Sequence, residues 1–447
     1  MQRMGVLRRP VFTMTAMTSS SRHFDILSFG AVGDGRTKCT AAIQAALDAC
    51  AAAGGGTVVV PAGTYLTGTI YLRSHVALRL EHAATLLGSP DLADYNPPDA
   101  YPQNFNCAVS EGWNACHLII AVGVEDVALS GTGTVDGNGR AFFSPPEKVS
   151  PPCEIAWRHG YLNTLDRANA ARPGQTIVFV ESRDISVTDI SLIDTTCWAL
   201  FFHGCERVRV RGLSIRSDNR HVNTDGIDID TCRHVVVSDC VIDTGDDAIT
   251  LRGDCNRLGD PSRVCEDISV TNCVAHTSAC GIHVGVGAGT IRDAVFSNLV
   301  LCDAGFGVQV RCSYSAKSKG VDISNLRFEN IICRRTAYPL LIHSGNENAT
   351  ARLENVTFSH CTFEGFLDAE IRGNGNMRPR GIRLHEIDFI GIAPDVELTR
   401  VKIPEAFVTV DRADDVAFEG VRVRYADGVP ARPALHLGDV GGIPPAI

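Results

Sequence analysis

The segment Glu206-Arg-Val-Arg-Val210 is one copy of a short pattern that recurs along the chain, two polar residues followed by alternating apolar ones. Further copies are Glu125–Leu129, Arg183–Val187, Arg233–Val237, Glu266–Val270 and Arg292–Phe296. From Arg183 onward, successive copies begin 23, 27, 33 and 26 residues apart. Each unit holds several short β-branched runs and no helical pattern, which predicts a parallel β-solenoid whose coils stack at a strand spacing of about 4.8 Å.

The repeats set the domain organisation. Later copies at Val321–Ser324, Glu354–Phe358 and Asp414–Phe418 carry the array to about residue 425. A β-sandwich of many strands is the alternative. It would not explain a regular repeat of this length, and the sequence lacks the hairpin turn signals that a sandwich needs. We therefore expect an all-β chain with one parallel β-helix domain at residues 23–447, preceded by a flexible tail at residues 1–22.

One helix is expected, at residues 40–53. Thr40 is its expected N-cap, and Gly54-Gly55-Gly56 would end it. Its apolar positions recur at helical spacing: Ile43, Ala46, Leu47 and Cys50. Because an open solenoid end exposes an unpaired strand edge, we expect this helix to cap the first coil.

Composition excludes several classes of protein. The chain has 41 basic and 51 acidic side chains, a formal charge of −10, which disfavours a nucleic acid partner. Hydrophobic residues make up 45% and charged residues 21%, as in folded globular chains. No stretch approaches the roughly 20 apolar residues of a membrane helix, so we expect no membrane partner either. Composition does not indicate the oligomeric state.

Seventeen cysteines are present, an odd number with scattered spacings and no CxxC pair. They are expected to be buried thiols rather than a disulfide framework or a zinc site. Near the N-terminus, Arg8 and Arg9 interrupt what would have to be the apolar part of a secretory signal. A cytoplasmic location is therefore favoured, while a periplasmic or secreted one stays open.

Acidic residues are concentrated in Asn223–Asp230 and in Gly245–Thr250. Asp225 and Asp246 are nearly one coil apart, so we expect them one above the other on the same face. Consecutive strand residues point to opposite faces, so Asp246 and Asp247 share a cleft only if Gly245 lets the backbone bend. The pattern predicts a cluster of three carboxylates.

Such a cluster has a definite chemistry, because like charges a few ångströms apart cannot all ionise and one proton is retained. Cleavage of a glycosidic bond requires one protonated carboxyl group and one ionised carboxylate. A calcium site and aspartates that cap turns use the same side chains. Spacing alone leaves all three readings open.

These motifs resemble glycoside hydrolase family 28, the polygalacturonases and their relatives. The likeness starts at Phe24, and its discriminating part is Asn223–Asp228 followed by Asp243–Ile249. Two further segments that resemble the family are Ala52–Gly68 and Gly131–Gly139. The resemblance implies a right-handed parallel β-helix that needs no metal or other cofactor. It implies hydrolysis, with inversion, of a pectic carbohydrate of the galacturonan or rhamnogalacturonan type.

The resemblance also implies roles for the aspartates. Asp246 would be the general acid, and Asp225 and Asp247 would hold and deprotonate the attacking water. Asn223 would hydrogen-bond the substrate or orient Asp225.

Two later motifs depart from the family pattern. The family reads Gly-His-Gly-x-Ser-Ile-Gly where this chain has Ala279–Gly285, so Cys280 takes the histidine position and His283 follows three residues later. Gln309-Val-Arg311 stands where many polygalacturonases carry Arg-x-Lys for the sugar carboxylate. We expect Asn223, His283, Gln309 and Arg311 to bind substrate. The single remaining cation makes neutral or differently decorated pectic sugars alternatives.

Further expectations concern the surroundings of the cleft. His203 and His221 are candidates to line it, and a family tyrosine expected near residues 343–346 has no counterpart. A lyase or epimerase acting on uronic-acid polysaccharide is the main alternative function. A β-helix that binds sugar without cleaving it is another.

Overall fold

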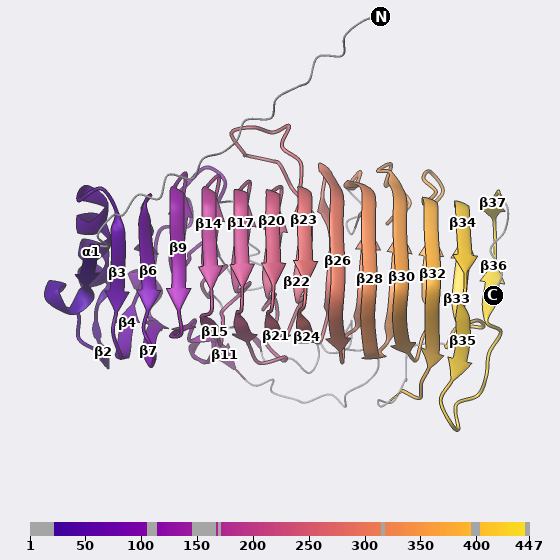
Figure 1. The fold of residues 1–447 in the computed structure, drawn as a ribbon, viewed down its shortest axis with the longest axis horizontal. Helices are drawn as coiled ribbons and strands as arrows, with labels where there is room; N and C mark the ends of the chain where they lie inside the picture. The colour runs from indigo at the N-terminus through magenta and orange to yellow at the C-terminus, as the bar shows by residue number, and fades with distance from the viewer. Residues whose placement is uncertain are drawn as a thin grey trace, which may run out of the picture.

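The structure, a computed structural model, describes residues 22–104, 114–144, 167–168, 171–313, 318–394 and 403–442. The chain forms a parallel β-helix that runs from α1 at one end to β37 at the other (Figure 1). Strands with apolar inner faces are stacked coil on coil, so the predicted solenoid is confirmed and the β-sandwich is excluded. Residues 1–21 of the expected tail lie outside the described residues.

Each coil contributes to two sheets. Sheet B contains one strand from each coil: β5 (Ile70–Tyr71), β8 (Ile119–Val122), β13 (Ile177–Val180), β16 (Leu200–His203), β19 (Ile227–Asp230), β22 (Ile249–Gly253), β25 (Cys280–Gly287), β27 (Phe306–Arg311), β29 (Tyr338–His343), β31 (Ala369–Arg372), β33 (Val408–Asp411) and β36 (Leu435–Leu437). These strands pair in parallel in the order of the sequence.

Sheet A wraps the rest of each coil in two columns of strands. The first column is β1 (His23–Asp25), β3 (Gly56–Val60), β6 (Val76–Leu80), β9 (Glu125–Gly131), β14 (Arg183–Thr188), β17 (Glu206–Arg211), β20 (Arg233–Ser238), β23 (Glu266–Thr271), β34 (Ala413–Glu419) and β37 (Val440–Gly441). The second column is β2 (Asp34–Lys38), β4 (Gly63–Thr67), β7 (Ala84–Gly88), β10 (Thr134–Asp136), β15 (Ser191–Ile193), β18 (Ser214–Arg216), β21 (Val241–Thr244), β24 (Val274–Thr277) and β35 (Arg422–Tyr425).

Toward the C-terminus the two columns merge. Strands β23 and β24 both pair with one long strand, β26. The long strands are β26 (Thr290–Cys302), β28 (Asp322–Thr336), β30 (Leu353–Gly365) and β32 (Arg380–Gly391). A small antiparallel pair, β11 (Phe143–Ser144) with β12 (Arg167–Ala168), lies outside both sheets.

The two polar residues that open each repeat have a structural cause. Glu206 pairs with Arg233 in the next coil, and Val208 pairs with Val235, so the copies stack in register. The polar residue between them has a left-handed backbone, with φ of 55° at Arg207. The equivalent residues Asp126, Asp184, His234, Asp267 and Asp293 also have positive φ. This conformation is costly for β-branched residues and tolerated by Asp and Asn, which explains the polar position.

Helix α1 (Thr40–Ala52) covers the first coil and buries the residues expected of it, Ile43, Ala46, Leu47 and Cys50. The expectation that Thr40 is the N-cap is wrong, because Cys39 takes that position. The Thr40 hydroxyl oxygen instead accepts a hydrogen bond of 2.8 Å from the backbone N–H of Gly68. Gly54 ends the helix with φ of 88°.

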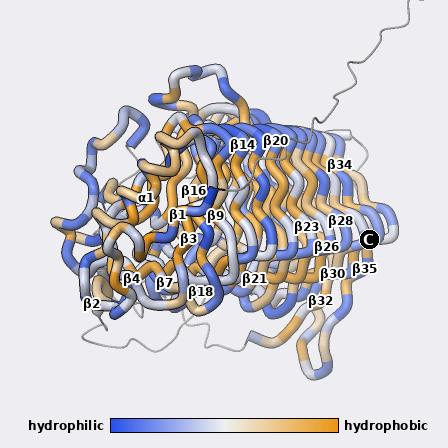
Figure 2. The backbone as a smooth tube through the Cα atoms, turned by 60° about the vertical axis from the view of Figure 1, so that its left-hand side comes forward, coloured by the Kyte–Doolittle hydropathy of each residue, from blue (hydrophilic) through white to orange (hydrophobic). Residues whose placement is uncertain are grey.

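The interior consists of apolar rows that run along the solenoid (Figure 2). Phe296, Phe328 and Phe358 stack on one another, with ring centroids 4.7 and 4.3 Å apart. The described cysteines are all free thiols, and Cys255 alone among them is not buried, which confirms the expected buried thiols. In the described part of the chain, no helix is long and apolar enough to cross a membrane.

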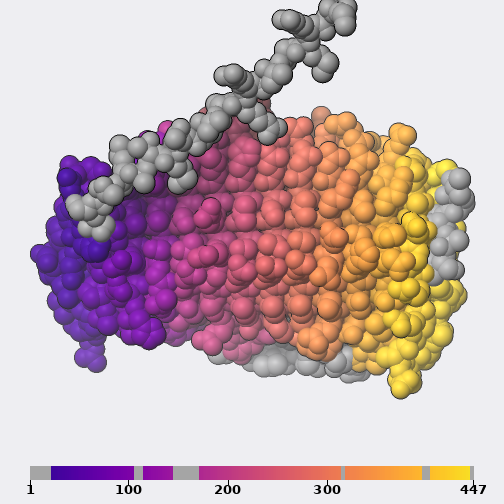
Figure 3. Space-filling model, in the orientation of Figure 1, coloured from indigo at the N-terminus to yellow at the C-terminus, as the bar shows by residue number. Residues whose placement is uncertain are grey.

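The solenoid keeps sequence neighbours together in space. The colour in Figure 3 changes steadily from one end of the molecule to the other, so each stretch of sequence occupies its own band of the surface. Residues that act together on sheet B therefore come from coils that follow one another in the chain.

Candidate active site

Asp225, Asp246 and Asp247 lie together at one edge of sheet B, just before β19 and β22. Carboxylate oxygens from all three lie within 4.8 Å of one another. Asp225 is 3% exposed and Asp247 7% exposed, whereas Asp246 is only partly buried. The three-carboxylate cluster predicted from the sequence is therefore present.

The turn that brings Asp246 and Asp247 to one side depends on Gly245. A Cβ atom at Gly245 would lie 2.3 Å from the carbonyl oxygen of His221 and 2.7 Å from the hydroxyl of Thr224. The backbone N–H of Gly245 donates to that hydroxyl at 3.0 Å. Close approach, rather than a left-handed backbone, is what requires glycine here.

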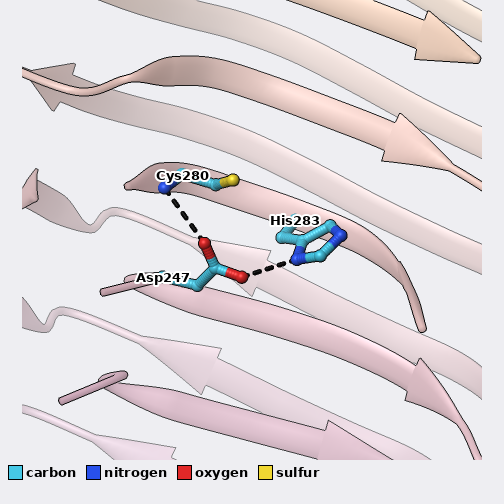
Figure 4. Close-up of side chains that lie close together, drawn as sticks. All are labelled: Asp247, Cys280 and His283. Atoms are coloured by element: carbon cyan, nitrogen blue, oxygen red, sulfur yellow. Dashed lines mark hydrogen bonds and ion pairs between the residues drawn. The ribbon is translucent and has the colours of Figure 1, made fainter. Parts of the chain in front are cut away.

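Asp247 accepts two hydrogen bonds from the next coil (Figure 4). Nδ1 of His283 donates to Oδ2 at 2.5 Å, and the backbone N–H of Cys280 donates to Oδ1 at 3.1 Å. Burial raises the pKa of Asp247, but His283, the Cys280 hydrogen bond and the Arg252 charge outweigh it and lower that pKa to about 2. Asp247 is therefore ionised near neutral pH, and the expectation that His283 faces the cluster agrees with the geometry.

Asp225 has the opposite character. Burial raises its pKa well above the usual range, and the charges of Asp228, Asp246 and Asp247 raise it further, while Arg252 lowers it. Asp228 is fully buried, and its pKa is raised to about 6 by burial against the opposing effect of Arg252. Near neutral pH the cluster therefore combines ionised Asp247 with Asp225, a neighbour that tends to retain a proton.

Arg252 is the cation that contacts two of these carboxylates, Asp225 and Asp228. Its Nε donates to Oδ1 of Asp228 at 2.7 Å, and its Nη2 lies 3.4 Å from Oδ2 of Asp225. Its guanidinium carbon lies 4.0 Å from the ring centroid of Trp198, a cation–π contact. Sequence reasoning missed Arg252 and the role of Asp228. Strand alternation places Asp228 and Asp230 on one face of sheet B, and Asp230 pairs with Arg252 on the next strand.

Asn223 lies two residues before Asp225, and its binding of substrate stays a prediction. Its backbone is left-handed, with φ of 56°, and its Oδ1 accepts a hydrogen bond of 3.0 Å from Arg172. Arg172 is fully buried, with its guanidinium carbon 5.0 Å from the ring centroid of Phe143. The contact with Arg172 was also missed, and it fixes Asn223 two residues before Asp225.

Gln309 and Arg311 lie on β27, one strand beyond His283. Gln309 pairs with His283 and is fully buried, and Arg311 pairs with Gly285. Arg311 is partly exposed, and its Nε donates to the carbonyl oxygen of Ser313 at 3.1 Å. Both residues share the sheet of the carboxylate cluster, and their binding of substrate stays a prediction.

The two histidines proposed to line the cleft are both buried. His203 Nε2 lies 2.9 Å from the carbonyl oxygen of Asp254. His221 stacks on Phe143, with ring centroids 4.0 Å apart and an interplanar angle of 7°. These contacts place both side chains among the residues that support the coils.

Two groups of side chains have the spacing to hold a metal ion: Asp225, Asp246 and Asp247, and Asp247 with Cys280 and His283. Calcium takes six to eight oxygen ligands, and the guanidinium group of Arg252 approaches the first group closely. Both oxygens of Asp247 already accept hydrogen bonds. This donor set fits proton transfer better than coordination of calcium.

Comparison with known proteins identifies the family of the chain. The model of the family "Glycosyl hydrolases family 28" matches residues 50–377. The chain is 29% identical over 252 residues to a probable polygalacturonase of Vitis vinifera, covering 55% of this chain and 47% of that protein. It is 26% identical over 389 residues to an exo-poly-alpha-D-galacturonosidase of Dickeya chrysanthemi, covering 79% of this chain and 60% of that protein.

The chain thus spans about half to three fifths of the length of these two relatives. Among solved structures, an exopolygalacturonase from Thermotoga maritima has the same fold, with a TM-score of 0.68, 21% identity, and coverage of 90% of this chain and 92% of that one. The family match covers most of the solenoid, including every aspartate of the cluster. The chain belongs to glycosyl hydrolase family 28.

Proposed function

We propose that this protein hydrolyses glycosidic bonds in a pectic carbohydrate of the galacturonan type, with inversion at the anomeric carbon. The observation that supports it most is the cluster of Asp225, Asp246 and Asp247, whose members have pKa values shifted in opposite directions. Groups of this kind supply the acid and the base of glycoside hydrolysis. The names of the Vitis and Dickeya relatives support galacturonan as the substrate.

In this proposal Asp246 protonates the leaving oxygen, because it is the most accessible of the three carboxyl groups. The proton that the raised pKa of Asp225 keeps in the cluster reaches Asp246 over a distance of at most 4.8 Å. Ionised Asp247, with Asp225, holds a water and removes its proton as the water attacks the anomeric carbon. The C–O bond to the leaving sugar breaks, and its oxygen departs as a hydroxyl group.

One observation favours a second candidate, a retaining hydrolase. Inverting enzymes usually separate their two carboxyl groups by about 6.5–9.5 Å and retaining ones by about 5–5.5 Å. The carboxylate oxygens here lie within 4.8 Å, closer to the second case. In that alternative a carboxylate attacks carbon directly and water releases the sugar later.

The experiment that tests the proposal is an assay on polygalacturonate, with proton NMR of the first product formed. Release of reducing ends with the inverted anomer supports the proposal, and the retained anomer supports the second candidate. An unsaturated product, seen by its ultraviolet absorbance, would establish a lyase instead. Bound but intact glycan would establish a sugar-binding β-helix.

A further inference from the structure

Sheet B continues past the carboxylate cluster with a row of basic side chains. Arg311 on β27 pairs with His343 on β29, and His343 pairs with Arg372 on β31. Residues paired in this way lie about 4.8 Å apart and point to the same face of the sheet. All three side chains are partly exposed. We call Arg311, His343 and Arg372 the basic row.

The row begins and ends at definite places. In the preceding strand its position is Gly285, where a Cβ atom would lie 2.2 Å from the carbonyl oxygen of Arg311, so the coil that holds His283 contributes no side chain to the row. In the following strand its position is Asp411. The basic row therefore covers three successive coils, starting one strand beyond His283.

The row is positively charged even after its internal ion pairs are counted. Glu370 lies between its members, with Oε2 at 2.7 Å from Nε2 of His343 and Oε1 at 3.2 Å from Nη2 of Arg372. The one carboxylate of Glu370 thus stands against the two charges of Arg311 and Arg372, and Asp368 beside Glu370 has a pKa raised to about 7, chiefly by burial. The pairing with Glu370 orients both basic groups.

Arg372 keeps donors for another acceptor. Its Nε is buried and has no hydrogen-bond acceptor within the described residues. A guanidinium group offers five N–H donors in a rigid fork that fits a carboxylate. An incoming carboxylate would meet the exposed part of the guanidinium group, since 38% of the Arg372 side chain is open to solvent.

Resting on the proposed function, we propose that the basic row binds the carboxylates of successive uronic acid units on the C-terminal side of the aspartate cluster. One strand spacing is close to the length of one sugar unit in the chain. In galacturonan every unit carries a carboxyl group, whereas in rhamnogalacturonan acidic units alternate with neutral rhamnose. A basic side chain on each of three consecutive coils therefore matches galacturonan.

The test compares kcat/KM for galacturonate oligomers of two to six units in the wild type, Arg372→Gln and His343→Gln. Arg372→Gln is expected to lower kcat/KM about tenfold for the longest oligomers, as loss of a charge-assisted hydrogen bond predicts, and to leave the dimer unchanged. On methyl-esterified oligomers the loss should disappear. Arg383→Gln is the matched control, because Arg383 is 41% exposed against 38% for Arg372 and is likewise paired with an acidic residue, Asp415, but lies on sheet A.

Equal losses of kcat/KM on short and long oligomers, or on acidic and esterified oligomers, would contradict carboxylate binding by the basic row. Unchanged kcat/KM in both variants would contradict it as well. If Arg372→Gln lowers the melting temperature, the kcat/KM values of His343→Gln on the same oligomers serve as the test instead. Failure of the proposed function would look different, because the wild type itself would then release no product from any oligomer.

Discussion

Nδ1 of His283 lies 2.5 Å from Oδ2 of Asp247, although 36 residues separate the two in the sequence. Each lies on its own coil, and the stacking of β22 and β25 alone brings them together. The ring keeps Asp247 ionised, while Asp225, a few ångströms away, is driven toward its neutral form. The same buried space thus contains a base and a source of protons.

Replacing Asp246 with asparagine should abolish turnover and leave the fold intact, because an amide of the same size cannot donate the acidic proton. The expected loss of kcat is about 10²- to 10⁴-fold. Asp239→Asn is the control, since Asp239 is exposed and its left-handed backbone suits asparagine. Retention of more than about a tenth of the activity would contradict the acid role of Asp246.

Arg252→Gln should move the acidic limb of the pH–rate profile to higher pH. Arg252 helps to lower the pKa of Asp247, the base of the proposed mechanism, so its loss raises that pKa, and the ionised form needed for water activation appears only at higher pH. Kinetics across the pH range measure the shift, with Arg383→Gln as the control. A reduced rate with an unmoved limb would mean that Arg252 acts by packing against Trp198.

Asp228→Asn should change how stability depends on pH. The folded pKa of Asp228 is about 6, above the ordinary value of about 3.9 for an aspartate, so ionisation is costly in the folded state. That cost sets in as the pH rises through about 4 and is complete above about 6, where it amounts to about 3 kcal/mol. Denaturant unfolding should show the wild type losing stability relative to the variant over this range, and parallel curves would contradict it.

Dialysis against a chelator should leave activity unchanged, because the carboxylates act by proton transfer and both oxygens of Asp247 already accept hydrogen bonds. The measurement is the rate on polygalacturonate before and after dialysis. Loss of activity that calcium restores would favour the lyase.

Arg311→Ala should lower kcat/KM about 10- to 1000-fold on an acidic substrate and less on an esterified one, because the guanidinium group is expected to pair with a sugar carboxylate. The two substrates are compared under identical conditions. Equal effects on both, or no effect on either, would argue for a different sugar beside the cleaved bond.

The sequence was sufficient for the solenoid, because its repeats record register directly: Glu206, Arg233 and Glu266 are paired neighbours in the structure. The aspartate cluster was also predictable, since Asp225 and Asp246 are separated by about one coil. Arg252 and Arg172 were not found. Their roles depend on how long side chains reach across neighbouring strands to Asp228 and Asn223, which spacing along one chain does not encode.

The steady order of coils along the solenoid also bears on how the enzyme unfolds. Such an array loses structure most readily at its ends, because an end coil has a neighbour on one side only. Asp225, Asp247 and His283 belong to consecutive coils in the middle of the array, with further coils on both sides. Fraying from either terminus must therefore remove several coils before the hydrogen bonds of the aspartate cluster open, and activity should survive the early stages of thermal unfolding.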